Sequence, residues 1–272
     1  MKQFTQMRQA LTFVELIFVI VILGIIASIG ADIIATTYES YIVQRAQYRA
    51  TSKTELALSQ IANRLRYAIP GTVVAEDGGV IKPITEITST TSNQLQWVAY
   101  DGDSFEAISS NTDRKPGWNG FCDVDASNAT TLSTPGSNLD LANTIISNLG
   151  GSLSSAYVYF PDGNSYAVGG GNGESISVNI PAGAGNRIYE RYKLAWSSYA
   201  IFWDGTDLYL YYNFAPTVSA SLGANRSLLL TNVTNFRFKG SEGSLRIKIC
   251  KEEQIGMNTD ETIHACKEKV IF

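Results

Sequence analysis

Few residues in this chain belong to the types that carry out acid, base or nucleophilic chemistry. It has one histidine, His264, and three cysteines, Cys122, Cys250 and Cys266. A Ser-His-Asp or Cys-His site needs a histidine beside its nucleophile, and a tetrahedral zinc site needs four ligands. His264 has only Cys266 as a nearby partner in the sequence. We therefore interpret it as a surface histidine and expect the protein not to be an enzyme.

Two acidic stretches contain oxygen ligands of the kind that calcium binds. One holds Asp101, Asp103 and Glu106, and the other holds Asp123 and Asp125. Their number and spacing match no cation-binding motif, so we favour solvated acidic loops. We expect no metal site and no cofactor, with calcium at these loops as the alternative.

The glycine-rich run Gly169-Gly170-Gly171-Asn172-Gly173 invites comparison with phosphate-binding loops. Such loops need a Lys-Ser or Lys-Thr pair and a helix that begins directly after them. Neither follows here, so the run predicts a flexible turn.

Aromatic side chains are concentrated between residues 192 and 212. They could stack on a glycan or a nucleobase, but aromatic residues are also common in strands because they pack well on a pleated surface. We favour core and strand packing, and a binding surface stays open as the alternative. The residues concerned are Tyr192, Tyr199, Trp203, Tyr209, Tyr211 and Tyr212.

The composition indicates a folded protein without a basic surface. The chain has 272 residues, of which 44% are hydrophobic, and its formal net charge is −4. This is enough apolar material for a sizeable core. No run of lysine or arginine offers contacts to phosphate groups, so nucleic acid is not an expected partner.

The N-terminal region is typical of a segment that spans a membrane. Residues 11–29 carry one charge, Glu15, in a run long enough to cross the hydrocarbon core as a helix. Lys2 and Arg8 precede this run, whereas the first charges after it are the acidic Asp32 and Glu39. By the positive-inside rule we expect a single-pass protein with a cytoplasmic N-terminus.

The order of features in this segment is a polar leader, a small residue, a short step, a glutamate and then the apolar core. The stretch Ala10-Leu11-Thr12-Phe13-Val14-Glu15-Leu16 resembles the cleavage motif of type IV pilin-like proteins, and Gly24 matches a glycine common in their helices. Two positions depart from the pattern. Ala10 stands where glycine is usual, and Asp32 stands where major pilins carry a proline, which favours a minor pilin or a minor pseudopilin of type II secretion.

This resemblance implies partners and a site. A prepilin peptidase would cut between Ala10 and Leu11, and Leu11 would become the modified, methylated N-terminus. Thr12, Glu15 and Gly24 would serve assembly with other pilin or pseudopilin subunits. Glu15 would pair with the new amine of its own or a neighbouring chain. The protein would lie in a bacterial inner membrane with its globular domain in the periplasm or on the filament.

Other interpretations of the same segment stay open. Residues 27–31 could act as a secretory cleavage site, or the segment could be a signal anchor in which Glu15 is incidental. The filament could be a type II secretion pseudopilus, a type IV pilus or a DNA-uptake machine, and the large domain suits a low-copy tip or initiation subunit. A membrane-anchored adhesin or ligand-binding protein is the alternative function, and a membrane-tethered enzyme is a third.

The fold class that we predict is α+β, with a long N-terminal helix packed on a mostly antiparallel sheet, as in pilins. Helical spacing continues beyond the membrane until Pro70-Gly71, so one helix of about 87 Å would cover residues 11–68. We divide the chain into a leader (1–10), a transmembrane and stalk helix (11–68) and a periplasmic β-rich domain (69–272). The apolar stripe comprises Leu58, Ile61, Ala62, Leu65, Ala68 and Ile69.

Strand patterns follow the helix. A hairpin is clearest at 192–203 and 208–214, and the run 228–240 followed by 245–250 also resembles the closing strands of the larger minor pseudopilins. Polar stretches at 101–120, 127–140 and 163–173 predict loops or partly ordered decoration of the domain. The remaining predicted strands are 94–100, 156–160, 228–230, 233–238, 245–250 and 266–272.

The last predicted hairpin places two cysteines at its flanks. Because the domain would lie in an oxidising periplasm, we predict a disulfide between Cys250 and Cys266 that leaves Cys122 free. The alternative is three reduced, buried thiols.

Overall fold

The protein is an α+β molecule, described by a computed structural model. Residues 12–87, 92–110, 112–183, 185, 187–241, 243–255 and 261–271 are described, with three α-helices and 15 strands. This confirms the predicted fold class. The chain divides into two compact units, Met1–Arg49 with Glu253–Ile263, and Ala50–Glu252 with His264–Phe272.

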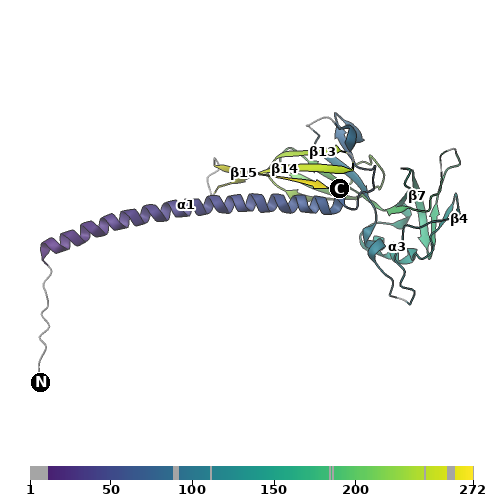
Figure 1. Ribbon diagram of the computed structural model, residues 1–272, viewed down its shortest axis with the longest axis horizontal. Helices are drawn as coiled ribbons and strands as arrows, with labels where there is room; N and C mark the ends of the chain where they lie inside the picture. Colours follow the sequence, from purple (N-terminus) through teal and green to yellow (C-terminus); the bar gives the residue numbers. More distant parts are fainter. Residues whose placement is uncertain are drawn as a thin grey trace, which may run out of the picture. The chain divides into compact units, whose positions relative to one another are not determined.

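Helix α1, Phe13–Leu65, is one continuous element of 53 residues (Figure 1). No proline interrupts it, so every turn after the first can form its backbone hydrogen bonds. It ends three residues before the predicted Ala68. Ala68 instead forms a bridge with Ala99, and the Tyr100 amide donates to the Tyr67 carbonyl over 2.9 Å. The helix therefore stops where its backbone joins the end of a strand.

The N-terminal part of α1 exposes its apolar side chains. Phe18 and Leu23, for example, are each 64% exposed. Among the described residues α1 is the one helix long and apolar enough to cross a membrane. This is compatible with the predicted single-pass anchor.

The C-terminal part of α1 belongs to the larger unit and packs on two antiparallel sheets. The first sheet has the strand order β12-β11-β10-β3-β1-β2, and the second has the order β13-β14-β15. The bounds of the first are β1 (Val74–Asp77), β2 (Val80–Pro83), β3 (Gln94–Ala99), β10 (Ser197–Trp203), β11 (Leu208–Phe214) and β12 (Arg226–Leu230). The second comprises β13 (Val233–Ser241), β14 (Ser244–Gln254) and β15 (Thr262–Ile271), and a short 3-10 helix, η1 (Ile84–Glu86), follows β2.

The predicted apolar stripe of α1 forms the centre of this first core. Leu58 and Ile61 are each 1% exposed, and they share a cluster with residues of both sheets. Thr54 is also buried, and its hydroxyl donates to the Ala50 carbonyl over 2.7 Å, so the polar atom is satisfied inside the helix. The sheet residues of the cluster include Leu95, Trp97, Ile201, Leu210, Phe236, Ile247, Ile249 and Ile271.

A third antiparallel sheet forms a second core with helix α3, Leu139–Asn148, and its strand order is β4-β5-β8-β7-β6-β9. Helix α3 buries Leu139, Ala142 and Ile146, which lie on one face by helical spacing. The remaining bounds are α2 (Gly102–Glu106), β4 (Asp123–Asn128), β5 (Thr131–Ser133), η2 (Leu153–Ser155), β6 (Tyr157–Tyr159), β7 (Ser165–Asn172), β8 (Ser175–Val178) and β9 (Lys193–Ala195).

The structure corrects the three loop predictions. The stretch 101–120 contains α2, the stretch 127–140 contains β5 and the first residues of α3, and the stretch 163–173 contains β7. In β7, Tyr166 and Val168 alternate with exposed residues, a strand pattern that the following glycines obscured. The glycine-rich run is accordingly a turn only at Gly173, whose φ is +52°.

The predicted strand 192–203 is two strands. β9 pairs with β6 in the third sheet, whereas β10 pairs with β3 and β11 in the first. Trp196 lies between them, at the point where the chain passes from one sheet to the other. Continuous apolar and aromatic residues do not reveal such a change of sheet.

The cysteines are arranged as expected. Cys250 in β14 and Cys266 in β15 form a disulfide, and Cys122 is free and buried. Burial raises the pKa of the Cys122 thiol above its ordinary value.

Candidate functional site

The start of α1 is a capping box. Glu15 Oε2 accepts hydrogen bonds from the backbone N–H and the hydroxyl of Thr12, each over 2.9 Å. In return, the Glu15 amide donates to the Thr12 hydroxyl oxygen over 3.4 Å. A threonine and a glutamate three residues apart satisfy the free N–H groups of a helix start in this way. The Glu15 carboxylate therefore has a structural partner within its own chain.

The structure shows fewer contacts for the other residues predicted for anchoring and assembly. Ala10 and Leu11, the predicted cleavage point, lie outside the described residues. Gly24 is exposed within the apolar part of α1, and a Cβ atom built on it would have no neighbour within 4 Å. Nothing in the described chain requires a glycine at that position.

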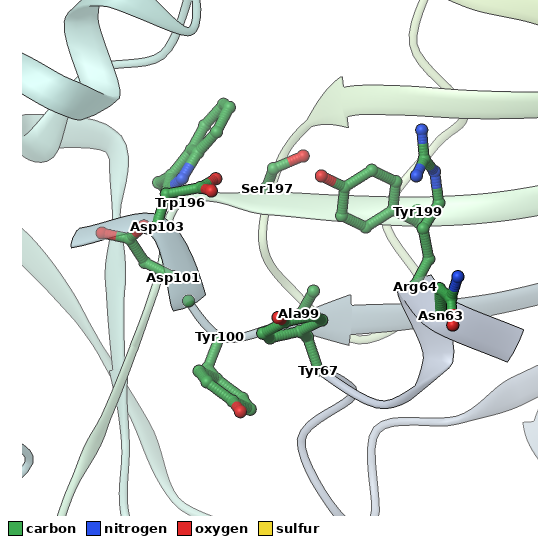
Figure 2. Close-up of a pocket in the computed structure, with 11 residues that line it drawn as sticks. Asn63, Arg64, Tyr67, Ala99, Tyr100, Asp101, Asp103, Trp196, Ser197 and Tyr199 are labelled. Atoms are coloured by element: carbon green, nitrogen blue, oxygen red, sulfur yellow. The ribbon is translucent and has the colours of Figure 1, made fainter. Parts of the chain in front are cut away.

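The larger unit contains a pocket of about 240 Å³. Four chain segments line it: 63–67 at the end of α1, 99–100 at the end of β3, 101–103 at the start of α2, and 196–199 at the start of β10. In Figure 2, Trp196 and Asp103 lie on one side of the pocket, and Tyr199, Arg64 and Asn63 lie on the other. Segments far apart in the sequence thus meet where the two cores join.

Close packing fixes two of the aromatic walls. A Cβ atom on Gly102 would lie 2.4 Å from Tyr67 Cε1, and a Cβ atom on Gly151 would lie 2.4 Å from Trp196 Cε3. Only glycine allows the backbone to approach these rings so closely. Tyr199, the third wall, stacks on the buried Trp97 with ring centroids 6.0 Å apart. The rings are thus held in place although all three remain partly exposed.

Polar groups surround these rings. The Arg64 guanidinium lies over the Tyr199 ring, 5.8 Å from its centroid, and Asn63 and Asp103 expose their side chains nearby. Burial raises the pKa of Tyr199, so its phenol is neutral at physiological pH. The Ser197 hydroxyl is already engaged, since it donates to the Ser198 carbonyl over 3.0 Å and accepts from the Asn213 amide over 3.0 Å.

Asp101 has a structural role beside this pocket. It is 3% exposed, and its Oδ1 accepts from the Ser104 amide over 3.1 Å as the N-cap of α2. Its backbone carbonyl accepts from the Trp118 indole over 2.8 Å. Burial raises the pKa of the Asp101 carboxyl above its ordinary value, because desolvation outweighs the hydrogen bonds from Ser104.

The acidic stretches do not assemble a metal site in the part of the chain that the structure describes. No three His, Cys, Asp or Glu side chains there are grouped as ligands of one ion. The Asp123 carboxylate instead accepts from the Ala126 amide over 3.2 Å. His264 is exposed, which confirms the prediction of a surface histidine.

The aromatic residues between 192 and 212 lie in several different parts of the structure. Tyr192 is buried in the second core, where burial raises its pKa. Tyr199 and Trp203 pack against the first core, and Tyr209 lies under the Arg226 guanidinium at 4.8 Å. Core and strand packing therefore accounts for most of these residues. Tyr199 alone among them lines the pocket in Figure 2.

Sequence reasoning missed Asn63, Arg64, Tyr67 and Trp196 as parts of one site. Asn63 and Arg64 were recognisable only as the polar side of a helix, and Trp196 only as one residue of a strand. The change of sheet beside Trp196, which brings this residue to the pocket, has no signal in the local sequence. No known protein family, characterised protein or solved structure shows a significant similarity to the chain.

Proposed function

We propose that this protein is a membrane-anchored structural subunit of a type IV pilin-like filament. The observation that carries the proposal is the continuity of α1, whose exposed apolar part passes without a break into residues buried in the first core. One helix would thus serve both as anchor and as structural element of the domain. A flexible linker between anchor and domain would not need such continuity.

The apolar part of α1 requires a non-aqueous partner. An exposed leucine or isoleucine side chain that is transferred out of water gains about 1.5 to 3 kcal/mol. The run contains many such side chains with exposures near or above half, including Val19, Ile20 and Ile26 at 56%, 59% and 61%. Lipid before assembly and neighbouring helices after it both supply this partner.

The capping box supports the proposed role of Glu15 in assembly. Its carboxylate is folded back onto the Thr12 backbone N–H, one residue from the nitrogen that cleavage after Ala10 would convert into an amine. In the processed protein the amine of Leu11 would lie near this carboxylate. The pair would cancel two charges that are costly in a lipid environment or a packed filament.

The finer assignment follows the sequence resemblance. Processing by a prepilin peptidase, an inner-membrane location, a periplasmic domain and a low-copy minor role all belong to the proposal. It covers type II secretion pseudopili, type IV pili and DNA-uptake filaments alike, and it includes no catalytic activity. The partners would be the other subunits of the same filament.

The mature N-terminus provides the first test. We expect mass spectrometry of protein isolated from membranes of its bacterial host to find a chain that begins at Leu11 and retains α1. A chain that begins within 28–32 would instead indicate a secretory signal peptide. A chain that retains Met1 would indicate a signal anchor, and either result would exclude the proposal.

Substitutions of Glu15 separate its charge from its capping role. Glu15→Gln retains the ability to complete the capping box but removes the charge, whereas Glu15→Val removes both. We expect both variants to insert into the membrane and to be cleaved, and both to be depleted from filaments when partner subunits are co-purified. If Glu15→Gln assembles normally while Glu15→Val does not, capping alone explains Glu15.

A further inference from the structure

We propose that the pocket in Figure 2 binds a neutral sugar ring, so that the domain carries a glycan-binding subsite. This goes beyond the proposed filament role and does not depend on it. The argument rests on the aromatic walls, on the charge balance of the polar groups and on the size of the pocket.

The aromatic walls suit a sugar better than a flexible apolar ligand. Trp196 and Tyr67 are each packed against a glycine, and Tyr199 is stacked on Trp97, so the walls are rigid before any ligand arrives. All three rings nevertheless remain partly exposed to the pocket. Ring C–H groups of a pyranose pack against such faces, and a preformed site avoids the entropy cost of ordering side chains on binding.

The polar groups are matched to hydroxyls. The Asp103 carboxylate accepts hydrogen bonds, the Arg64 guanidinium donates them, and the Asn63 amide does both. Hydroxyl groups are both donors and acceptors, so one ring bearing several of them can satisfy all three side chains. Within the described residues, neither Asn63 nor Asp103 has a side-chain hydrogen bond to another residue, so both are available to a ligand.

The balance of charge argues against an ionic ligand. Arg64 and Asp103 contribute one charge of each sign to the exposed lining, and Asp101, which also lines the pocket, is only 3% exposed. The exposed side chains therefore offer no net counter-charge to an anion or a cation. Arg64 would repel an amine from the Tyr199 ring, where it already lies. Asp103 would similarly oppose a carboxylate or a phosphate. A neutral ligand avoids both penalties.

The size of the pocket restricts the ligand to one ring at a time. A volume of about 240 Å³ is just below the usual range of drug-sized ligand sites, roughly 300 to 1,000 Å³. One hexose or N-acetylhexosamine unit of a longer glycan fits this description. For a single ring we expect a Kd on the order of millimolar.

The test uses the full chain in phospholipid nanodiscs, which avoids detergents with sugar head groups. Methyl glycosides and short neutral oligosaccharides of glucose, galactose, mannose and N-acetylglucosamine are titrated while tryptophan fluorescence is recorded. Sialylated and sulfated oligosaccharides serve as charged comparisons. We expect saturable binding of at least one neutral sugar and weaker binding of its charged derivatives.

Variants then locate the binding. Asp103→Asn should weaken the affinity roughly tenfold or more, because hydrogen bonds to charged groups are the strong ones, whereas the exposed control Asp125→Asn should leave it unchanged. Trp196→Ala should abolish binding, and Trp196→Phe should retain most of it because a ring remains. Since Trp196→Ala can also disturb folding, Asp103→Asn at the exposed rim is the decisive variant.

Three outcomes would overturn the proposal. They are no binding of any neutral sugar by the wild-type protein, a preference for the charged derivatives, and equal affinities in Asp103→Asn and Asp125→Asn.

Discussion

Replacing Cys250 and Cys266 together with alanine removes the covalent link between β14 and β15. The cysteines are 16 residues apart in the sequence, and the chain-entropy relation for a loop of this length gives about 3 kcal/mol of stabilisation at 25 °C. For a domain of this size, each kcal/mol corresponds to about 2 to 4 °C in Tm. We therefore expect the Tm of the double variant to lie about 6 to 12 °C below that of the wild type.

The position of the disulfide also predicts which part of the fold loses stability first when it is removed. In the described part of the chain β15 is an edge strand that pairs with β14, and its Ile271 belongs to the first core. Without the disulfide, β15 should open locally before the larger unit unfolds. Amide hydrogen exchange should accordingly rise first in Thr262–Ile271, while the amides of β10 and β11 keep their protection.

The assay is thermal unfolding of the full chain in nanodiscs, with and without reductant. Reductant should lower the Tm of the wild type toward that of the double variant and should leave the double variant unchanged. Thiol counting under denaturing conditions should find one free thiol, Cys122, before reduction and three after it. Three free thiols in exported protein, or equal Tm values for the two proteins, would refute this reasoning.

Two further predictions concern the cores. Ile61→Ala should lower the free energy of unfolding by about 2 to 5 kcal/mol, because it leaves a cavity at a residue that is 1% exposed, and chemical denaturation measures this. The control is Leu56→Ala on the same helix, at a residue 60% exposed, which should change the free energy of unfolding by no more than about 0.5 kcal/mol. Similar losses of stability in both variants would contradict the packing described for α1. Asp101→Asn keeps an oxygen for the α2 cap but removes a buried carboxyl whose pKa is raised in the folded state. The wild-type protein therefore loses stability as pH rises from the ordinary aspartate pKa of 3.8 to the raised pKa of Asp101, and the variant does not. The Tm of the variant relative to wild type should therefore be higher at pH 7 than at pH 3.5, and a constant difference would show that Asp101 does not titrate differently in the folded protein.

The sequence predicted those helices and strands whose buried face follows from the spacing of apolar residues within the element itself. The stripe around Leu58 and Ile61 placed the helix on its core correctly. The predicted strand 245–250 lies within β14, where Leu245, Ile247 and Ile249 are buried. The β10–β11 hairpin was found because a short turn joins two regular strands. In each case a single stretch of sequence contains the information.

Features that depend on distant contacts escaped prediction. Helix α3 is short and follows a polar stretch, so its three buried residues gave too weak a pattern to distinguish it from a loop. The change of sheet at Trp196 depends on which strands pair with β9 and with β10. The pocket depends on four segments, and the close approaches of Gly102 to Tyr67 and of Gly151 to Trp196 have no sequence signature.

The order in which the residues of the first core are synthesised also limits when the domain can fold. Leu58 of α1 is among the first residues of the larger unit to leave the ribosome, whereas the sheet residues Phe236, Ile247 and Ile271 are among the last. Until β13 to β15 have been synthesised, the apolar stripe of α1 lacks much of its cover. A nascent chain interrupted before β13 would present that stripe to chaperones and proteases, so the domain becomes resistant to degradation only after β13 to β15 have been synthesised.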